Sequence, residues 1–242
     1  MPGAAPPATL VTSRPLDEYC AVFGLTRAVL GRLPGPVLDC PGGAAGLAAE
    51  ADRIGCRVIA ADPLYAVPAP QLVSLARVGR ETMAAAMRDR PRLYAAPRHV
   101  RPDKYLRSWD RARLLFSADR AANPGRYVAA ELPRLPFADG AFALTLSSYL
   151  LFAYPDLFGP QEQLAGLLEL VRVTDPAGEV RVHPLHDGSG RRCPHLGALR
   201  SGLGREGVAS EILPVTAGGV ARRVLVLRAA GAARAVRRAR VR

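Results

Sequence analysis

Short apolar runs bounded by glycine and proline recur along this chain, and stretches of helical periodicity separate them. Such alternation is typical of a parallel β-sheet, because two parallel strands need a long connection that usually contains a helix. The sequence therefore predicts an α/β fold with a doubly wound, seven-stranded, mostly parallel sheet. The predicted strands lie at residues 36–40, 57–62, 127–131, 143–151, 179–185, 211–215 and 223–228.

Helices are predicted between these strands at residues 44–54, 71–88, 161–173 and 196–205, where apolar side chains recur every three or four positions. The last two strands break the alternation. They are joined through Ala217, Gly218 and Gly219 with no helix between them, which predicts an antiparallel hairpin at the C-terminal end of the sheet. A purely parallel dinucleotide-binding fold would need a crossover at this point.

The length of 242 residues and the apolar content of 49% favour a single domain with one ample core, at residues 14–228. Residues 1–13 are rich in proline and alanine but lack the basic start and apolar core of a signal peptide, so we expect a flexible N-terminus and a cytoplasmic protein. Residues 91–124 carry aromatic and basic side chains where a short connection would suffice. They are predicted to be an insertion, or lid, over the strand ends.

The net charge of +12 has a local source at the C-terminus. Six arginines follow Leu227 with no acid among them, so residues 229–242 are predicted to form a basic tail, either solvated or bound to a nucleic acid. The four cysteines are scattered without a Cys-x-x-Cys pair, which predicts reduced thiols and no metal site. The most apolar stretch, residues 142–158, is too short and too often interrupted by polar residues to cross a membrane.

The strongest site signal is a glycine pair at the end of the first predicted strand, in the segment Asp39-Cys40-Pro41-Gly42-Gly43. Glycine at such a turn lets a ligand approach the main chain closely. The next predicted strand ends at Asp62, nineteen residues after Gly43, which is the spacing at which an acid reaches ribose hydroxyls. Pro63 fixes the backbone beyond it. The alternative is a tight turn followed by a helix-capping Asp62.

Residues 131–142 have the sequence Glu-Leu-Pro-Arg-Leu-Pro-Phe-Ala-Asp-Gly-Ala-Phe. Through this motif above all, the chain between residues 37 and 185 resembles class I S-adenosylmethionine-dependent methyltransferases, and it is most similar to the ubiquinone- and menaquinone-biosynthesis group. The resemblance implies S-adenosylmethionine as cofactor. It places Glu131 near the adenine, gives Leu132 a backbone contact, and puts Ser147 and Ser148 at a strand end that faces the reactive methyl.

Two positions depart from that family. The usual Gly-x-Gly-x-Gly keeps only its central glycine, at Gly43, and the acid that commonly follows the Leu-Pro-Phe element is Ala143. The N-terminal segment, residues 14–23, is predicted to be a helix laid across the strand ends, where Tyr19 and Arg14 would touch the cofactor. Alternatively, Tyr19 and Phe23 pack on the core one helical turn apart.

Methyl transfer mainly requires that a nucleophile be held in line with an already electrophilic carbon. His183 and Tyr149 are the catalytic candidates, with His186 and Tyr154 nearby in the sequence, although a histidine here is more often structural. We expect a small-molecule acceptor. The alternatives are an RNA- or ribosome-directed methyltransferase, a methyltransferase-like binding protein without activity, and an NAD-dependent oxidoreductase, which would lack the C-terminal hairpin.

Overall fold

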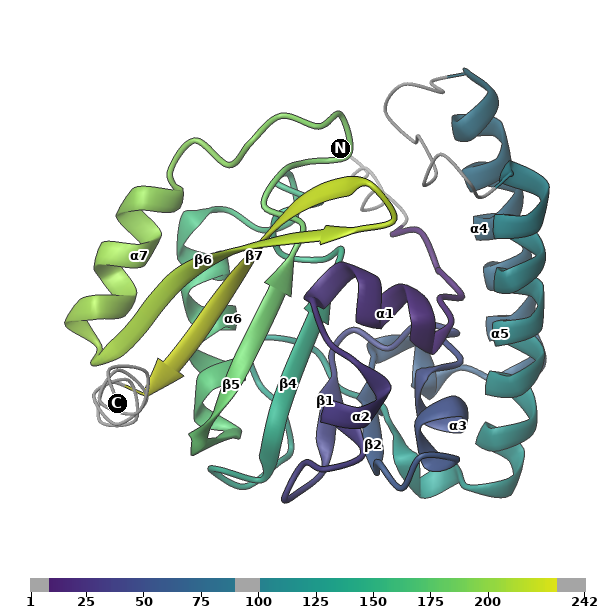
Figure 1. Ribbon diagram of the computed structural model, residues 1–242, viewed down its shortest axis with the longest axis horizontal. Coiled ribbons are helices and arrows are strands. Elements are labelled where there is room, and N and C mark those ends of the chain that lie inside the picture. Colours follow the sequence, from purple (N-terminus) through teal and green to yellow (C-terminus); the bar gives the residue numbers. More distant parts are fainter. Residues whose placement is uncertain (1–8, 90–100, 230–242) are drawn as a thin grey trace, which may run out of the picture.

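The structure is a computed structural model that describes residues 9–89 and 101–229 (Figure 1). Its centre is a seven-stranded sheet in the order β3-β2-β1-β4-β5-β7-β6, in which β7 runs antiparallel to both of its neighbours. The predicted mostly parallel sheet with an antiparallel C-terminal hairpin is confirmed. The strands are β1 (Val37–Asp39), β2 (Val58–Ala61), β3 (Tyr127–Val128), β4 (Phe142–Ser148), β5 (Thr174–His183), β6 (Val208–Ala217) and β7 (Val220–Ala229).

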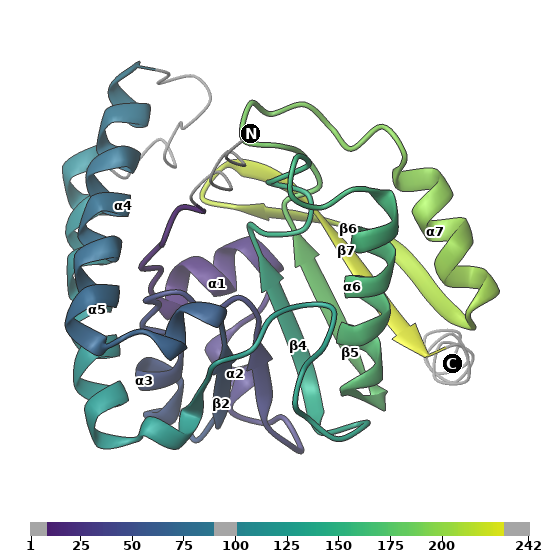
Figure 2. The ribbon, with the colours of Figure 1, turned by 180° about the vertical axis from the view of Figure 1, so that it is seen from behind.

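Helices cover both faces of the sheet (Figures 1 and 2). Alternate residues of a strand point to opposite faces. Val37 therefore belongs to the apolar core on one face, and Leu38 belongs to the core on the other face. The helices are α1 (Leu16–Phe23), α2 (Arg27–Leu30), α3 (Leu47–Asp52), α4 (Ala69–Asp89), α5 (Pro102–Ala122), α6 (Pro160–Arg172) and α7 (Leu196–Arg205), with short 3₁₀ turns η1 (Pro63–Ala66) and η2 (Pro124–Arg126).

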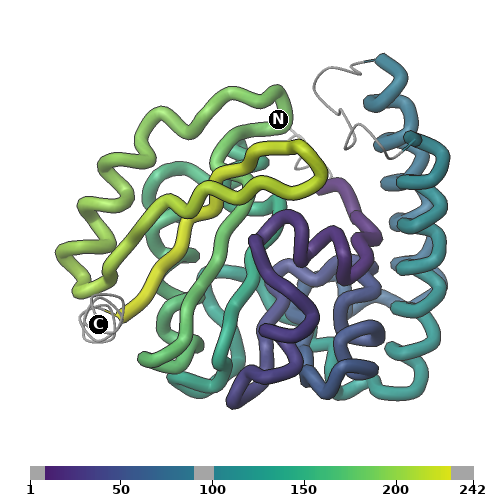
Figure 3. The backbone as a smooth tube through the Cα atoms, viewed as in Figure 1, coloured from purple at the N-terminus to yellow at the C-terminus, as the bar shows by residue number. Residues whose placement is uncertain are grey.

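The segment expected as an insertion over the strand ends is largely helical. Residues 102–122 form α5, a single 21-residue helix that stands beside α4 at one side of the molecule (Figure 3). Its buried side chains follow helical spacing and are Leu106, Trp109, Ala112, Arg113 and Phe116. Arginines and aspartates lie between these buried positions, so the helical spacing of the apolar side chains is hard to detect in the sequence. Residues 91–100 of the expected insertion lie outside the described residues.

The boundaries at the two ends of the domain also differ from expectation. Val11 and Ser13, which lie within the expected flexible N-terminus, are buried. At the other end, Ala229 is still part of β7, and the rest of the expected basic tail lies outside the described residues. No helix in residues 9–89 and 101–229 is long and apolar enough to cross a membrane.

Candidate functional site

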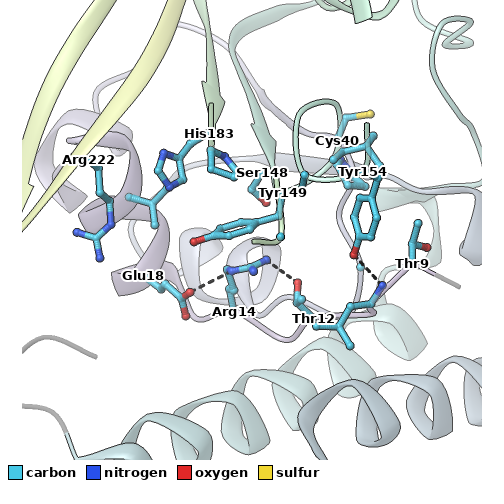
Figure 4. A pocket seen from close by; sticks show the side chains of 18 of the residues that line it. Thr9, Thr12, Arg14, Glu18, Cys40, Ser148, Tyr149, Tyr154, His183 and Arg222 are labelled. Atoms are coloured by element: carbon cyan, nitrogen blue, oxygen red, sulfur yellow. Dashed lines mark hydrogen bonds and ion pairs between the residues drawn. The ribbon is translucent and has the colours of Figure 1, made fainter. Parts of the chain in front are cut away.

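A pocket of about 1470 Å³ opens at the carboxyl ends of β1, β2, β4 and β5 (Figure 4). Open α/β sheets bind ligands at this edge. Most of the predicted site residues line it, namely Cys40, Gly43, Asp62, Pro63, Glu131, Leu132, Ser148, Tyr149 and His183. The other predicted cofactor residues, Tyr19, Asp39, Gly42 and Ser147, are not among the lining residues. Tyr19, Asp39 and Ser147 are buried.

The glycine turn after β1 is held against the end of β2. The Asp62 carboxylate accepts the backbone N–H of Gly43 and that of Leu64, each at 2.9 Å. A Cβ atom on Gly42 would come within 2.3 Å of the Tyr65 hydroxyl, and Gly43 has a φ of +53°. Crowding by a neighbouring side chain therefore favours glycine at position 42, and the left-handed backbone conformation favours it at position 43.

Asp62 is a helix cap, as the alternative interpretation held, because it begins η1 through the N–H of Leu64. It also faces the pocket, so capping does not exclude ligand binding. Burial raises the pKa of Asp62, while the N–H groups of Leu64 and Gly43 lower it.

Behind the pocket wall, the Tyr19 hydroxyl donates a 2.8 Å hydrogen bond to Oδ2 of Asp39. Oδ1 of Asp39 is buried and has no partner among the described residues. Burial raises the pKa of Asp39 to about 8, although the Tyr19 hydrogen bond opposes this shift. Tyr19 also packs against Phe23, with ring centroids 6.1 Å apart. The Tyr19 side chain thus supports the site from within the core.

Arg14 and Tyr149 line the pocket and contact each other. The Arg14 guanidinium lies 3.9 Å from the Tyr149 ring centroid, and Tyr149 has a φ of 53°, which is uncommon for a non-glycine residue. Such a backbone conformation at the end of β4 costs free energy and is often found at functional sites. Arg14 is 4% exposed and pairs with Glu18 at 3.0 Å.

Glu18 is a site residue that the sequence did not reveal. Besides Arg14, it accepts the Tyr105 hydroxyl at 2.9 Å and the Trp109 indole N–H at 3.1 Å. These contacts join α1 to α5 across 87 and 91 residues of sequence. The spacing of Arg14 and Glu18, one helical turn apart, was the only local signal for the pair.

His183 ends β5 and faces the pocket. Its Nδ1 lies 3.1 Å from the carbonyl oxygen of Arg223. Because a carbonyl only accepts, Nδ1 carries the proton in the neutral ring and Nε2 has a free lone pair. Burial, together with the nearby His186, Arg222 and Arg14, lowers the pKa of His183 to about 4.

The Leu-Pro-Phe element is anchored from α6. Arg172 donates to the carbonyl oxygens of Phe137 at 2.9 Å and Leu135 at 3.1 Å, and Glu169 accepts the N–H of Leu135 at 2.6 Å. This anchor fixes the loop whose start, Glu131 and Leu132, lines the pocket. Most of the element is therefore structural.

Residues 9–14 lie against the glycine turn and bond to its backbone. The carbonyl of Thr12 accepts the N–H of Ala44, and that of Arg14 accepts the N–H of Gly46, both at 3.0 Å. The N–H of Leu10 donates to the Tyr154 hydroxyl at 2.9 Å, a contact drawn in Figure 4. The helix predicted from Ala44 begins at Leu47, after the two residues whose N–H groups bond to this segment.

No family model matches the chain. A curated relative, the uncharacterized protein MJ0045 of Methanocaldococcus jannaschii, is 22% identical over 178 residues, which cover 73% of this chain and 78% of the relative. The solved structures with a similar backbone include the 1,6-didemethyltoxoflavin-N1-methyltransferase of Burkholderia thailandensis, at 17% identity and a TM-score of 0.46 over 84% of this chain and 76% of that one. They also include the magnesium protoporphyrin IX methyltransferase of Synechocystis PCC 6803, at 15% identity and a TM-score of 0.44 over 88% and 80%. At such values the similarities assign no activity to this chain.

Proposed function

We propose that this chain is an S-adenosylmethionine-dependent methyltransferase that acts on a small-molecule acceptor. The observation that carries the proposal is the pocket itself. One side of it brings together the glycine turn, Asp62 and Glu131, and the other side presents Tyr149 and His183. A cofactor-binding half and an acceptor-binding half are therefore contiguous in one cavity. The C-terminal antiparallel hairpin disfavours the oxidoreductase alternative.

The residues present fit this cofactor. Asp62 would accept hydrogen bonds from the ribose hydroxyls, since each of its oxygens receives one N–H and keeps a second lone pair. Glu131 and Leu132 would contact the adenine. Asp39 lies behind the pocket wall, so it is not among the residues that would contact the cofactor.

When bound, the cofactor would supply an electrophilic methyl group, so the protein's task is to position the acceptor. Tyr149 offers a flat ring whose orientation is fixed by Arg14 and by the edge of His183, with ring centroids 5.6 Å apart. The low pKa of His183 makes it a weak base, so Nε2 is suited to accepting a hydrogen bond from the acceptor. An acidic acceptor, such as a phenol or an enol, therefore fits this site.

Calorimetric titration with S-adenosylhomocysteine tests the cofactor assignment, and a thermal melt with the same ligand checks it independently. We expect saturable heat and a raised melting temperature. The absence of both effects at millimolar ligand would contradict the proposal. Binding without methyl transfer to any member of a panel of phenols and enols would instead favour the inactive binding protein.

A further inference from the structure

One wall of the pocket is rich in basic side chains. It is formed by the end of β5, the loop before α7 and the tip of the β6–β7 hairpin, and it contains His183, His186, Arg192, Arg222 and Arg223. The one acid that lines this wall, Asp187, already accepts hydrogen bonds from Ser189 at 2.6 Å and Arg191 at 3.0 Å. Its three arginines outnumber this acid, so the wall carries an excess of positive charge.

Arg222 is the half-buried cation of this group. Its guanidinium reaches the backbone carbonyls of Ala217 at 3.4 Å and Val220 at 3.3 Å, which are long hydrogen bonds. Among the described residues, no carboxylate forms an ion pair with Arg192, Arg222 or Arg223, although many of the other arginines have one. These three arginines can therefore still form charge-assisted hydrogen bonds with an anion at the pocket wall.

Basic groups from different parts of the chain converge on His183. Burial is the largest cause of its lowered pKa, and the neighbouring His186, Arg222 and Arg14 lower it further. They come from three segments, namely the loop after β5, β7 and the N-terminal segment. Arg14 is neutralised by Glu18, whereas Arg222 is not. Figure 4 shows Arg222, His183 and Tyr149 around the same part of the cavity.

We propose that this wall binds an oxyanion, a carboxylate or a phosphate, carried by the small-molecule methyl acceptor, with Arg222 as its principal cation. The inference rests on the proposed function, because it names the chemical class of that acceptor. Enclosure favours a small molecule over RNA. His183 is 5% exposed, so an acceptor in contact with it must enter the cavity, whereas a polynucleotide backbone would stay at the rim.

Benzoate and inorganic phosphate are the probes, and the histidine ring signals in a two-dimensional NMR spectrum are the readout. The chain has four histidines, so each signal is assigned by single substitution. Titrations are run with and without S-adenosylhomocysteine. We expect both anions to shift the His183 and His186 signals and to leave the signal of His195, which bonds Gln163, in place. Neutral benzamide should bind about tenfold more weakly than benzoate.

Arg222→Gln should weaken benzoate binding about tenfold. The matched control is Arg200→Gln, which removes the same charge from α7, where Arg200 donates to Ser210 outside the pocket lining. We expect the control to bind benzoate as the wild type does. An unchanged far-ultraviolet circular dichroism spectrum and an unchanged His195 signal without ligand show that each variant is folded.

The proposal is overturned if neither anion shifts the two signals, if benzamide binds as well as benzoate, or if Arg222→Gln has no more effect than the control. A short single-stranded RNA that shifts them at lower concentration than both anions would overturn the small-molecule assignment. Failure of the cofactor assignment is seen separately, because S-adenosylhomocysteine is titrated alone. If only that titration fails, the anion site stands and the methyltransferase proposal falls.

Discussion

Replacing Asp39 by asparagine should make the stability of the ligand-free protein less sensitive to pH. The side chain is 1% exposed, and burial raises its pKa to about 8. An unfolded chain would hold an aspartate with a pKa of about 3.9. Asp39→Asn keeps the size of the side chain and its ability to accept from the Tyr19 hydroxyl, but it removes the ionisable group.

The sign follows from proton binding. Between about pH 4 and pH 8, folded Asp39 keeps a proton that the unfolded chain has released, so the free energy of unfolding falls as pH rises. One proton corresponds to about 1.4 kcal/mol per pH unit. The variant lacks this loss, so its stability relative to the wild type should grow by about 3 kcal/mol from about pH 5.5 to pH 7.5. Contributions from His183 and Asp62 occur in both proteins and cancel to first order.

Denaturant unfolding at several pH values measures this difference, and the fluorescence of Trp109, the single tryptophan, reports it. Asp17→Asn is the control, because the Asp17 side chain is 77% exposed. Its difference from the wild type gives the baseline for the loss of an exposed carboxylate. A flat difference for Asp39→Asn across this pH range would show that the buried carboxylate is ionised at neutral pH, and the reasoning would fail.

Two further variants test the support of the pocket, and a third serves as a surface control. Asp62→Asn should lower the free energy of unfolding by about 0.5 to 2 kcal/mol, as measured by denaturant unfolding, because an amide has one acceptor oxygen for two N–H donors. It should also weaken S-adenosylhomocysteine binding tenfold or more, as measured by calorimetry. Arg172→Ala should destabilise the fold by about 1 to 2 kcal/mol in denaturant, since it frees two carbonyls of the Leu-Pro-Phe loop. Arg107→Ala, on an exposed surface, should cost less than about 0.5 kcal/mol.

Most of the sheet could be predicted from the sequence, because buried parallel strands leave a local signature. β1 is buried at all three of its positions and β2 at all four, and apart from Asp39 all of these residues are apolar. The hairpin of β6 and β7 was predictable from its glycine-containing connection. The third strand was overestimated, since β3 spans only Tyr127 and Val128 before the chain turns toward Glu131.

The candidate site was only partly predictable. The glycine turn and Asp62 lie on neighbouring strand ends, so spacing along the chain brought them together correctly. Glu18 was not predictable in this way, because its partners Tyr105 and Trp109 lie on a helix whose position against α1 is a property of the whole fold. The cationic wall was missed for the same reason, since Arg222 and His183 come from different strands.

The segment before α1 and the helix itself link the two halves of the pocket. On one side, the carbonyls of Thr12 and Arg14 accept the N–H groups of Ala44 and Gly46, just before α3. On the other side, the Arg14 guanidinium stacks on Tyr149. A movement of this segment would therefore act on the glycine turn and on Tyr149 together. Glu18 joins α1 to α5, so the position of α5 helps to fix where the segment before α1 lies. This contact gives a structural reason for a long, regular α5 at the side of the sheet.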